Sequence, residues 1–333
     1  MRPGRLVAAG LVIGALTVVA LWLLPSDSYL LLPDKAKPLA EKVEVQGEKP
    51  HPPGGIYYVD VIVRKASLLE ELAGPTRPEG ADLVPEHALV PPGSNFRERR
   101  RQNLRQMDRS QKIAAAVALR ELGRDVKAEP EGALVVAVAP DAPAAGKIEA
   151  TDVLVAVDGT RVRTPDDLRR LIGLHDPGEK VLLRVRRGAS TREIEVGTIE
   201  SPDEQGRPIV GIQVEQSAEI ELPIDVEIDL GGVGGPSAGL AFALDIVEEL
   251  RGGVDRGLDV AATGELELDG DVLPIGGVKQ KVIGARRSGA DIFLVPAGDN
   301  AAEARRHAGD LRIIPVESFR QALQALATVA EKA

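Results

Sequence analysis

The residue most suggestive of chemistry is a single serine surrounded by glycine. Residues 231–240 read GGVGGPSAGL, and an apolar run that predicts a helix follows Ser237 at once. Glycine permits positive φ angles and close backbone approach, and the first turn of a helix leaves its N–H groups without partners. Such N–H groups, together with the positive end of the helix dipole, can stabilise an oxyanion. The segment therefore predicts either a nucleophilic serine or an ordinary flexible loop.

A nucleophilic serine needs a base, and histidine is the first candidate. GPSAG fits the G-x-S-x-G nucleophile elbow of α/β-hydrolases, which requires an acid and then a histidine downstream. The only histidine after Ser237 is His307, which lies in a polar helical stretch typical of a surface. This pattern disfavours a histidine base and leaves lysine as the alternative.

The segment that follows carries a lysine in a longer, ordered pattern. Residues 262–296 read ATGELELDGDVLPIGGVKQKVIGARRSGADIFLVP. The GPSAG loop followed by TGE, LPIGGVKQK and a strand ending in VP resembles the proteolytic domain of the Lon proteases. The resemblance implies that Ser237 is the nucleophile, Lys281 the general base and Thr263 a hydrogen-bond partner of the lysine. The loop expected to hold the oxyanion comprises Gly234, Gly235, Pro236 and Ser237.

One position departs from many members of that family. Many Lon enzymes have Asp just before P-S-A-G, whereas this chain has Gly235. In this respect the chain resembles the membrane-anchored, PDZ-containing branch, and the expected Ser–Lys dyad is unaffected.

Lys281 can act as a base only if its amine is neutral. A free lysine has a pKa of about 10.4 and is protonated near neutral pH. Burial disfavours the ammonium form and can lower the pKa by ~3–5 units. VLPIGGV before the lysine pair and VIGA after it can supply an apolar surround, whereas Lys279 is expected to face solvent. We therefore expect a buried Lys281 with a lowered pKa.

The stretch between Gly123 and Gly206 has the pattern of a small β-rich domain. It contains several short apolar strands and one helix, for which Thr164 is well placed as a cap. VVAVAPDAPAAGKIEATDVLVAVDGTRV resembles a bacterial PDZ domain, with Thr151 where that pattern usually has glycine. The alternative is a small β domain without a ligand.

A PDZ-like domain binds a peptide end as an added strand at an exposed sheet edge. The resemblance places this edge at residues 133–138 and the loop that receives a C-terminal carboxylate at residues 131–134. The expected peptide contacts are Gly132, Ala133, Leu134 and Val136.

The N-terminal segment predicts a membrane anchor. Residues 6–24 carry no charge and are just long enough to span a bilayer at ~1.5 Å rise per residue. Arg2 and Arg5 precede the run and acidic residues follow it, so the N-terminus is expected in the cytoplasm and the rest outside. A cleaved signal peptide is the competing interpretation, but the run is long and no clear A-x-A site follows. We expect an uncleaved single-pass anchor in the cell membrane.

Composition excludes several other classes of protein. A net charge of −10 and an aromatic content of 2% argue against a nucleic-acid-binding surface. The chain has no cysteine, and its four histidines are scattered without ligand spacing, so we expect neither a metal site nor a cofactor. No G-x-x-x-x-G-K-[ST] sequence occurs, so the ATP-driven motor of full-length Lon is not expected here.

These patterns together predict an α+β fold in which a PDZ-like domain is inserted into a Lon proteolytic domain. The helix expected at residues 107–123 resembles one that precedes the catalytic strand in Lon domains. The expected parts are a transmembrane anchor at 1–25, a linker at 26–55, an N-terminal Lon-like part at 56–123, a PDZ-like domain at 124–203 and the Lon core at 204–333.

The predicted function is an ATP-independent, membrane-anchored serine endopeptidase with a Ser–Lys dyad. Its substrates are expected to be peptides or unfolded proteins, bound or presented by the PDZ-like domain. The alternative is a non-catalytic peptide-binding or adaptor protein on a Lon-like scaffold, although a scaffold has no need of Ser237, Thr263 and Lys281 together. The resemblance also implies a homo-oligomer, a hexameric ring.

Overall fold

The computed structural model describes residues 3–40, 42–45, 55–89, 96–202 and 204–329. The chain forms two compact units. The first comprises residues 1–114, 226–266 and 270–333, and the second comprises residues 115–225 and 267–269. The chain thus leaves the first unit after residue 114 and returns to it at residue 226.

The first unit is built on a five-stranded sheet in the order β2-β4-β16-β19-β20. The last four strands are parallel, and β2 is antiparallel to β4. Parallel strands are buried on both faces, which explains the unbroken apolar sequence IFLVP of β19. The strands are β2 (Lys37–Pro38), β4 (Ile56–Tyr58), β16 (Val260–Ala262), β19 (Ile292–Pro296) and β20 (Arg312–Val316).

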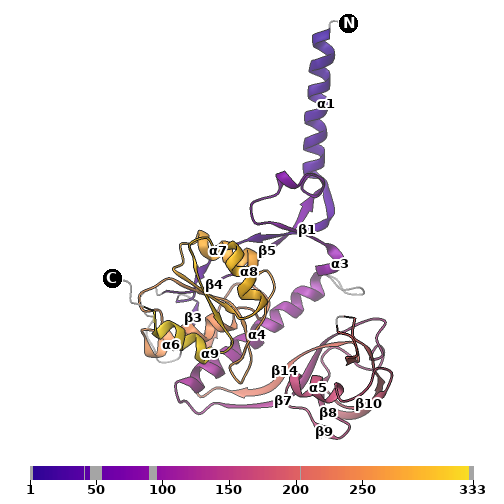
Figure 1. The fold of residues 1–333 in the computed structure, drawn as a ribbon, viewed down its shortest axis with the longest axis vertical. Helices are drawn as coiled ribbons and strands as arrows, with labels where there is room; N and C mark the ends of the chain where they lie inside the picture. The colour runs from indigo at the N-terminus through magenta and orange to yellow at the C-terminus, as the bar shows by residue number, and fades with distance from the viewer. Residues whose placement is uncertain (1–2, 41, 46–54, 90–95, 203, 330–333) are drawn as a thin grey trace. The chain divides into compact units, whose positions relative to one another are not determined.

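Helices cover this sheet. Helices α7 and α8 pack against each other over a core that includes Val59, Ala261, Phe293 and Val295 (Figure 1). Helix α6 contacts α9 and the strands β4 and β16. The helices are α6 (Gly239–Arg251), α7 (Val278–Arg287), α8 (Asp299–His307) and α9 (Phe319–Ala327).

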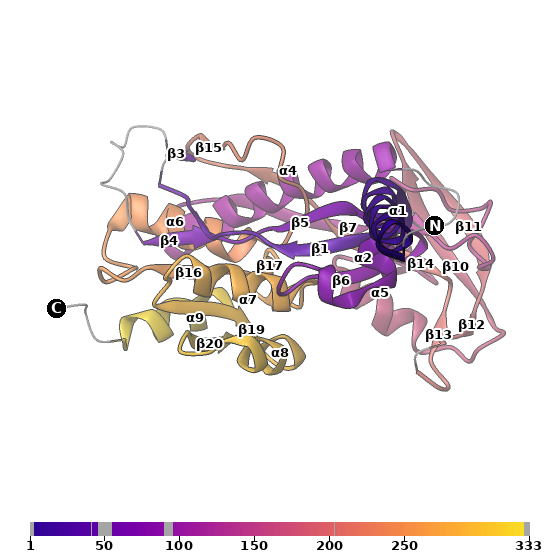
Figure 2. The same cartoon turned by 90° about the horizontal axis from the view of Figure 1, so that it is seen from above.

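A second, smaller sheet of the first unit has the order β5-β1-β6. In Figure 2, β1 and β5 run side by side, and their antiparallel register pairs Pro33 with Val61. Single strand pairs join β3 to β15 and β17 to β18. These elements are β1 (Pro25–Pro33), β3 (Val43–Val45), β5 (Val61–Ser67), α2 (Leu68–Leu72), a 3₁₀ turn (Gly74–Thr76), β6 (Asp82–Pro85), α3 (Glu86–Leu89), β15 (Val226–Ile228), β17 (Glu265–Leu266) and β18 (Val272–Leu273).

The N-terminal parts differ from the expected linker. Strands β1, β2 and β3 all lie within residues 26–55 or begin just before them, and each pairs with another strand of the first unit. The strands β4 and β5 follow each other closely and are separated by Val59 and Asp60.

The expected anchor forms a helix, α1 (Pro3–Leu23). Within the part of the chain that the structure describes, none of the helices is both long enough and apolar enough to cross a membrane.

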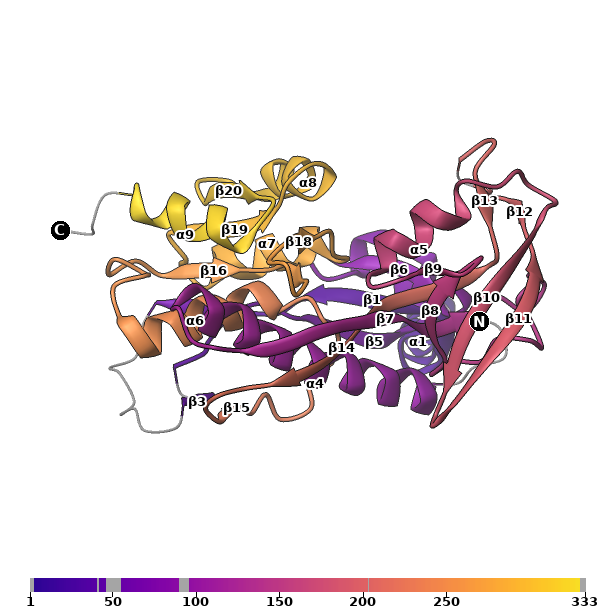
Figure 3. The ribbon, with the colours of Figure 1, turned by 90° about the horizontal axis from the view of Figure 1, so that it is seen from below.

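The second unit consists mainly of one sheet and the helix α5, which share a hydrophobic core. Its main sheet has the order β11-β10-β8-β7-β14, with β9 paired to β8, and the long strands β7 and β14 run side by side in Figure 3. Helix α5 begins after Thr164, whose side chain accepts a hydrogen bond from the Asp167 N–H at 3.1 Å, so the predicted cap is confirmed. Helix α4 (Phe96–Glu121) begins in residues of the first unit and ends in residues of the second.

The remaining elements of the second unit are β7 (Lys127–Val138), β8 (Val153–Val157), β9 (Thr160–Arg161), α5 (Pro165–Ile172), β10 (Lys180–Arg187), β11 (Ser190–Gly197), β12 (Ile199–Glu200), β13 (Pro208–Ile209) and β14 (Ile212–Glu221).

The predicted peptide-binding edge at residues 133–138 is wrong. Strand β7 lies inside the sheet, because β14 pairs along one of its sides and β8 along the other. Ala133 is fully buried, and a Cβ added to Gly132 would lie 2.4 Å from the Leu154 carbonyl oxygen. Residues of this interior strand, including Leu134 and Val136, cannot accept another strand. Among the described strands, β14 forms the end of the sheet on this side.

Candidate active site

Ser237 lies at the start of helix α6, two residues before its first residue Gly239. Its carbonyl oxygen is held by two donors, the backbone N–H of Gly264 at 2.8 Å and the Thr263 hydroxyl at 3.0 Å. Gly264 must lack a side chain, because a Cβ there would lie 2.5 Å from a methyl carbon of Val272. Thr263 and Gly264 of the TGE segment therefore hold the backbone of Ser237 in place.

The glycine-rich loop is fixed from the other side by helix α4. The Gly235 N–H donates to the Asn103 carbonyl at 2.8 Å, and the Ser110 hydroxyl donates to the Pro236 carbonyl at 2.9 Å. Gly235 has a φ of +97°, and a Cβ at Gly234 would lie 2.8 Å from the Asn103 Cβ. Glycine is thus required at both positions, one for its backbone conformation and one for close packing.

Only some backbone N–H groups of the 234–237 loop are available to bind an oxyanion. The N–H of Gly235 is already used by Asn103, and proline has no N–H. Among the described residues, the N–H groups of Gly234 and Ser237 have no hydrogen-bond partner. The prediction that the whole 234–237 loop supplies donors is therefore wrong for Gly235 and Pro236. Asn103 and Ser110, which shape this loop, lie in helix α4; Ser110 falls in the segment that resembles a Lon helix, but neither residue was predicted to contact the loop.

Lys281 faces Ser237 from helix α7. Its Nζ lies 2.6 Å from the Ser237 Oγ and 3.1 Å from the Thr263 Oγ1. The Lys281 residue is 3% exposed and Thr263 is fully buried. The structure thus brings together the three residues that the sequence singled out. Because the Thr263 hydroxyl donates to the Ser237 carbonyl, it offers its lone pairs to the amine of Lys281.

The environment of Lys281 favours the neutral amine. Burial lowers the pKa of Lys281 to about 7, and the negative charge of Asp60 opposes this shift. Lysine normally titrates near 10.5, so burial converts a cation into a base that is available near neutral pH.

Close contacts fix the position of helix α7. A Cβ at Gly277 would lie 2.9 Å from a methyl carbon of Val61, and one at Gly284 would lie 1.9 Å from the Asp34 carbonyl oxygen. Gln280 donates to Asp82 at 2.8 Å, and Lys279 pairs with the same carboxylate at 2.6 Å. Lys279 is therefore partly buried and paired, which differs from the expected solvent-facing side chain.

Ser237 and Lys281 line a cavity of about 580 Å³ within the first unit. Aliphatic side chains line much of the cavity, and charged groups contributed by Asp60, Arg99 and Arg100 also border it. Its aliphatic lining comprises Val59, Val61, Val63, Leu89, Leu104, Met107 and Val233. A cavity of this composition suits an extended peptide with an apolar side chain next to the nucleophile.

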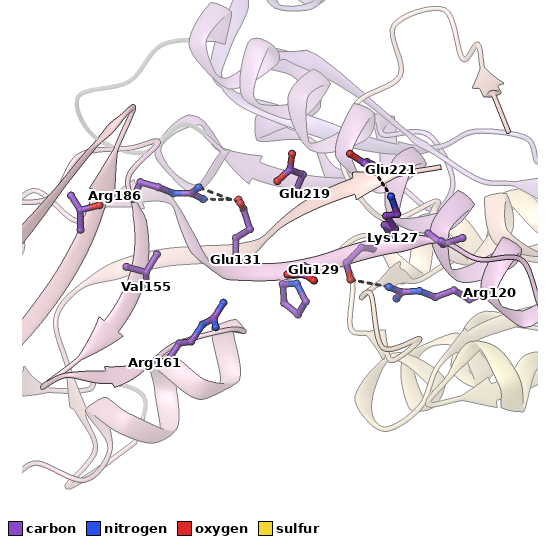
Figure 4. A pocket seen from close by; sticks show the side chains of 13 residues that line it. Arg120, Lys127, Glu129, Glu131, Val155, Arg161, Arg186, Glu219 and Glu221 are labelled. Carbon is purple, nitrogen blue, oxygen red and sulfur yellow. Dashed lines mark hydrogen bonds and ion pairs between the residues drawn. The ribbon is translucent and has the colours of Figure 1, made fainter. Parts of the chain in front are cut away.

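The second unit has cavities of a different character. Figure 4 shows a cavity of about 780 Å³ in which Arg186 points at Glu131 and Lys127 points at Glu221, with distances of 2.6 and 3.4 Å. Ion pairs dominate this cavity, and it has no nucleophile beside a base. A groove of about 330 Å³ lies between β14 and α5 and is lined mainly by aliphatic side chains.

Among the residues that the structure describes, no three His, Asp or Glu side chains are grouped so as to hold a metal ion.

Comparison with protein families gives two matches. Residues 212–328 match the Lon protease (S16) C-terminal proteolytic domain, and residues 120–198 match the PDZ domain. The first match contains the site described above, and the second falls in the second unit.

Individual relatives agree with the first match. Lon protease 1 of Sorangium cellulosum is 41% identical over 110 residues, which are 30% of this chain and 13% of that protein. Lon protease of Paraburkholderia phytofirmans is 43% identical over 100 residues, 29% of this chain and 11% of that protein. The chain thus matches only about an eighth of the length of these curated relatives.

Two solved PDZ domains are similar to about a quarter of this chain. A PDZ domain of an SdrC-like protein from Listeria monocytogenes is 22% identical, with a TM-score of 0.24, and covers 25% of this chain and 87% of that one. A homologous domain from Listeria innocua is 26% identical, with the same TM-score, and covers 25% and 92%. The chain thus combines a region similar to the Lon protease (S16) C-terminal proteolytic domain with a region similar to a PDZ domain.

Proposed function

We propose that this chain is a serine endopeptidase with a Ser–Lys dyad that hydrolyses peptides or unfolded proteins without ATP. The observation that carries the proposal is the 2.6 Å approach of the Lys281 Nζ to the Ser237 Oγ in a buried site. A neutral amine at that distance can accept the hydroxyl proton, which is the geometric requirement for a general base.

Each group of the site has a role in the proposed reaction. Lys281 takes the proton of Ser237, and the Ser237 Oγ attacks the peptide carbonyl carbon. The N–H groups of Gly234 and Ser237 receive the developing oxyanion, aided by the helix α6 dipole. The Lys281 ammonium then donates its proton to the leaving amine, and a water molecule activated by the neutral lysine hydrolyses the acyl-enzyme.

Hydrolysis of an unfolded protein such as reduced, alkylated casein tests this proposal. We expect turnover by the full chain without ATP and loss of at least about a thousandfold in Ser237→Ala and Lys281→Met. Lys281→Arg is a matched control for charge, because arginine stays protonated and should be as inactive as Lys281→Met. Equal turnover by wild type and Ser237→Ala would support the alternative, a non-catalytic adaptor.

We also propose that the second unit binds peptide ends at the groove between β14 and α5, not at β7. Strand β14 ends the sheet among the described strands, so its outer side can accept an added strand. Leu168 and Ile172 from α5 line the groove together with Ile212 and Val214, which suits an apolar side chain. Arg207, which pairs with Glu204 at 2.9 Å, also lines the groove and can exchange this partner for a terminal carboxylate.

Replacement of Ile172 by Glu tests this groove. Binding of peptides with an apolar, free C-terminus should weaken at least tenfold, whereas Val136→Thr in β7 should leave the affinity unchanged. The opposite pattern would refute the proposed groove.

We further propose that α1 attaches the chain to the cell membrane, with the N-terminus cytoplasmic and both units extracytoplasmic. Support comes from the large apolar side chains of α1 between Leu11 and Leu23, which are exposed to solvent. Fractionation of cells expressing the full chain or Leu16→Glu/Val19→Glu tests attachment, and access of external protease tests orientation. The homo-oligomeric ring implied by the family is a further proposal, which light scattering of the detergent-solubilised chain tests.

A further inference from the structure

A cluster of three charged residues reaches the catalytic cavity through one of its members, Asp60. The Lys37 Nζ donates to the Asp34 Oδ2 at 2.8 Å and to the Asp60 Oδ2 at 3.1 Å. Although burial alone would lower it, the pKa of Lys37 is raised by these two carboxylates. Burial raises the pKa of Asp60, against the hydrogen bond from Lys37. We call Asp34, Lys37 and Asp60 the acidic cluster, because two carboxylates share one ammonium.

The backbone around Asp60 is packed directly on the helix that carries the base. Asp60 lies in the break between β4 and β5. Its two neighbours contact α7 on either side of Lys281, one near Gly277 and the other near Gly284. Val61 contacts the position of Gly277, and Val59 contacts the position of Gly284, where a Cβ would lie 2.9 and 3.2 Å from their methyl carbons. Asp60 therefore has a fixed place relative to Lys281, and both side chains line the same cavity.

We propose that Asp60 is a positioning residue for the general base: its carboxylate, shared with Asp34 and Lys37, stabilises the ammonium that Lys281 becomes when it takes the Ser237 proton. This inference rests on the proposed peptidase function. Asp60 does not contact Ser237 or Lys281 by any hydrogen bond in the described structure, so it acts on the base through its charge.

The other charged groups around the base are paired or lie on other elements that border the cavity. On α7 itself, Lys279 is paired with Asp82, and Arg287 is paired with Glu79 at 3.2 Å. From α4, Arg99 and Arg100 border the cavity, and from β4 the Tyr58 hydroxyl has a pKa raised by burial. Of these groups, Asp60 is the one whose charge raises the pKa of Lys281 against the effect of burial.

Removing the carboxylate should have two separable effects. Without the Asp60 charge, the ammonium of Lys281 is less stable, so the amine is neutral over a wider range of pH. The acid limb of kcat/KM should therefore move to lower pH, by about 0.5–1 unit. The plateau rate at high pH should fall about threefold to tenfold, because the ammonium formed during acylation loses its stabilising carboxylate.

The test measures kcat/KM of the full chain from pH 5 to 10 with a fluorogenic peptide. Asp60→Asn keeps the shape of the side chain and should show both the lower acid limb and the lower plateau. Asp27→Asn, an exposed carboxylate of β1, is the matched control and should superimpose on wild type. A purely structural role would lower activity at every pH without moving the limb, and that result would overturn the proposal.

The reciprocal variant removes the compensating cation. Lys37→Met leaves the carboxylates with less balancing charge, so the acid limb should move to higher pH, whereas Lys37→Arg and the exposed Lys35→Met should leave it in place. This series also covers the case in which Asp60→Asn does not fold. An unchanged limb in both Asp60→Asn and Lys37→Met would refute the inference.

A readout without catalysis separates this inference from the proposed function. In protein labelled with [ε-¹³C]lysine, the Lys281 signal is identified by its loss in Lys281→Met, and its titration midpoint is followed in each variant. If the midpoint falls in Asp60→Asn but wild type hydrolyses nothing, the influence of Asp60 stands and the peptidase proposal fails. If wild type is active and the midpoint is the same in Asp60→Asn, the inference about Asp60 fails alone.

Discussion

The hydroxyl of Thr263 should orient the base. It donates to the Ser237 carbonyl and lies 3.1 Å from the Lys281 Nζ, so it fixes one direction of the amine while the Ser237 Oγ occupies another. Thr263→Val keeps the shape of the side chain but removes the hydroxyl. The Ser237 carbonyl keeps its second donor, the Gly264 N–H at 2.8 Å, so the loss is confined to the lysine.

The expected magnitude follows from one buried hydrogen bond. Leaving a buried polar group without a partner costs about 1–3 kcal/mol. If this cost appears in the transition state, kcat/KM falls about 10-fold to 100-fold. The assay is hydrolysis of a fluorogenic peptide at pH 9, where the lysine is neutral in both proteins, with the unfolding midpoint measured in parallel.

Thr263→Ser is the matched control. It keeps the hydroxyl and removes a fully buried methyl group, so it should lower stability by about 1 kcal/mol while retaining most of the activity. If Thr263→Val were as active as wild type, or if Thr263→Ser were the poorer enzyme, the orienting role of the hydroxyl would be refuted.

Three further outcomes follow from the same structure. Because the pKa of Lys281 lies at about 7, kcat/KM should rise tenfold per pH unit below pH 7 and level off above it; a limb near 10 would contradict this. Burial raises the pKa of Asp245 to about 8, so folding takes up a proton between pH 4 and 8 and the stability of the fold is lost as pH rises through this window. Asp245→Asn should therefore flatten the dependence of the unfolding free energy on pH, and in urea unfolding at pH 7 it should add on the order of 4 kcal/mol. Gly264→Ala should cost about 2 kcal/mol or more and lower activity, because its methyl group would overlap Val272, and a wild-type unfolding midpoint would exclude that overlap.

The chemical core of the site could be predicted from sequence because its residues lie in long, ordered motifs. Ser237 and Lys281 were each identified by neighbours within ten residues, and the need for a neutral amine follows from elementary acid–base chemistry. The distance between their side chains could not be read from the sequence, since it depends on how α6 packs on β16 and how α7 packs in the core around Ala261.

Features set by pairing between distant segments could not be predicted. The burial of β7 depends on β14, whose residues lie about 80 positions later in the chain, so an apolar strand looked like a free edge. The importance of Asp60 arises only because it lies between β4 and β5, where its two neighbours pack on α7. The hydrogen bond from Gly235 to Asn103 likewise joins segments more than a hundred residues apart.

The contact between Gly284 and the Asp34 carbonyl has a practical meaning for anyone trimming this protein. Together with the 2.8 Å hydrogen bond from the Ala36 N–H to the Ser288 hydroxyl, it ties the stretch just after α1 to both ends of the turn that follows the base. A shortened version starting at Ile56 would leave the back of α7 bare and lose Lys37 along with it. A shortened version should therefore start no later than Pro25, so that β1 and the contacts of Asp34 and Ala36 with α7 are kept.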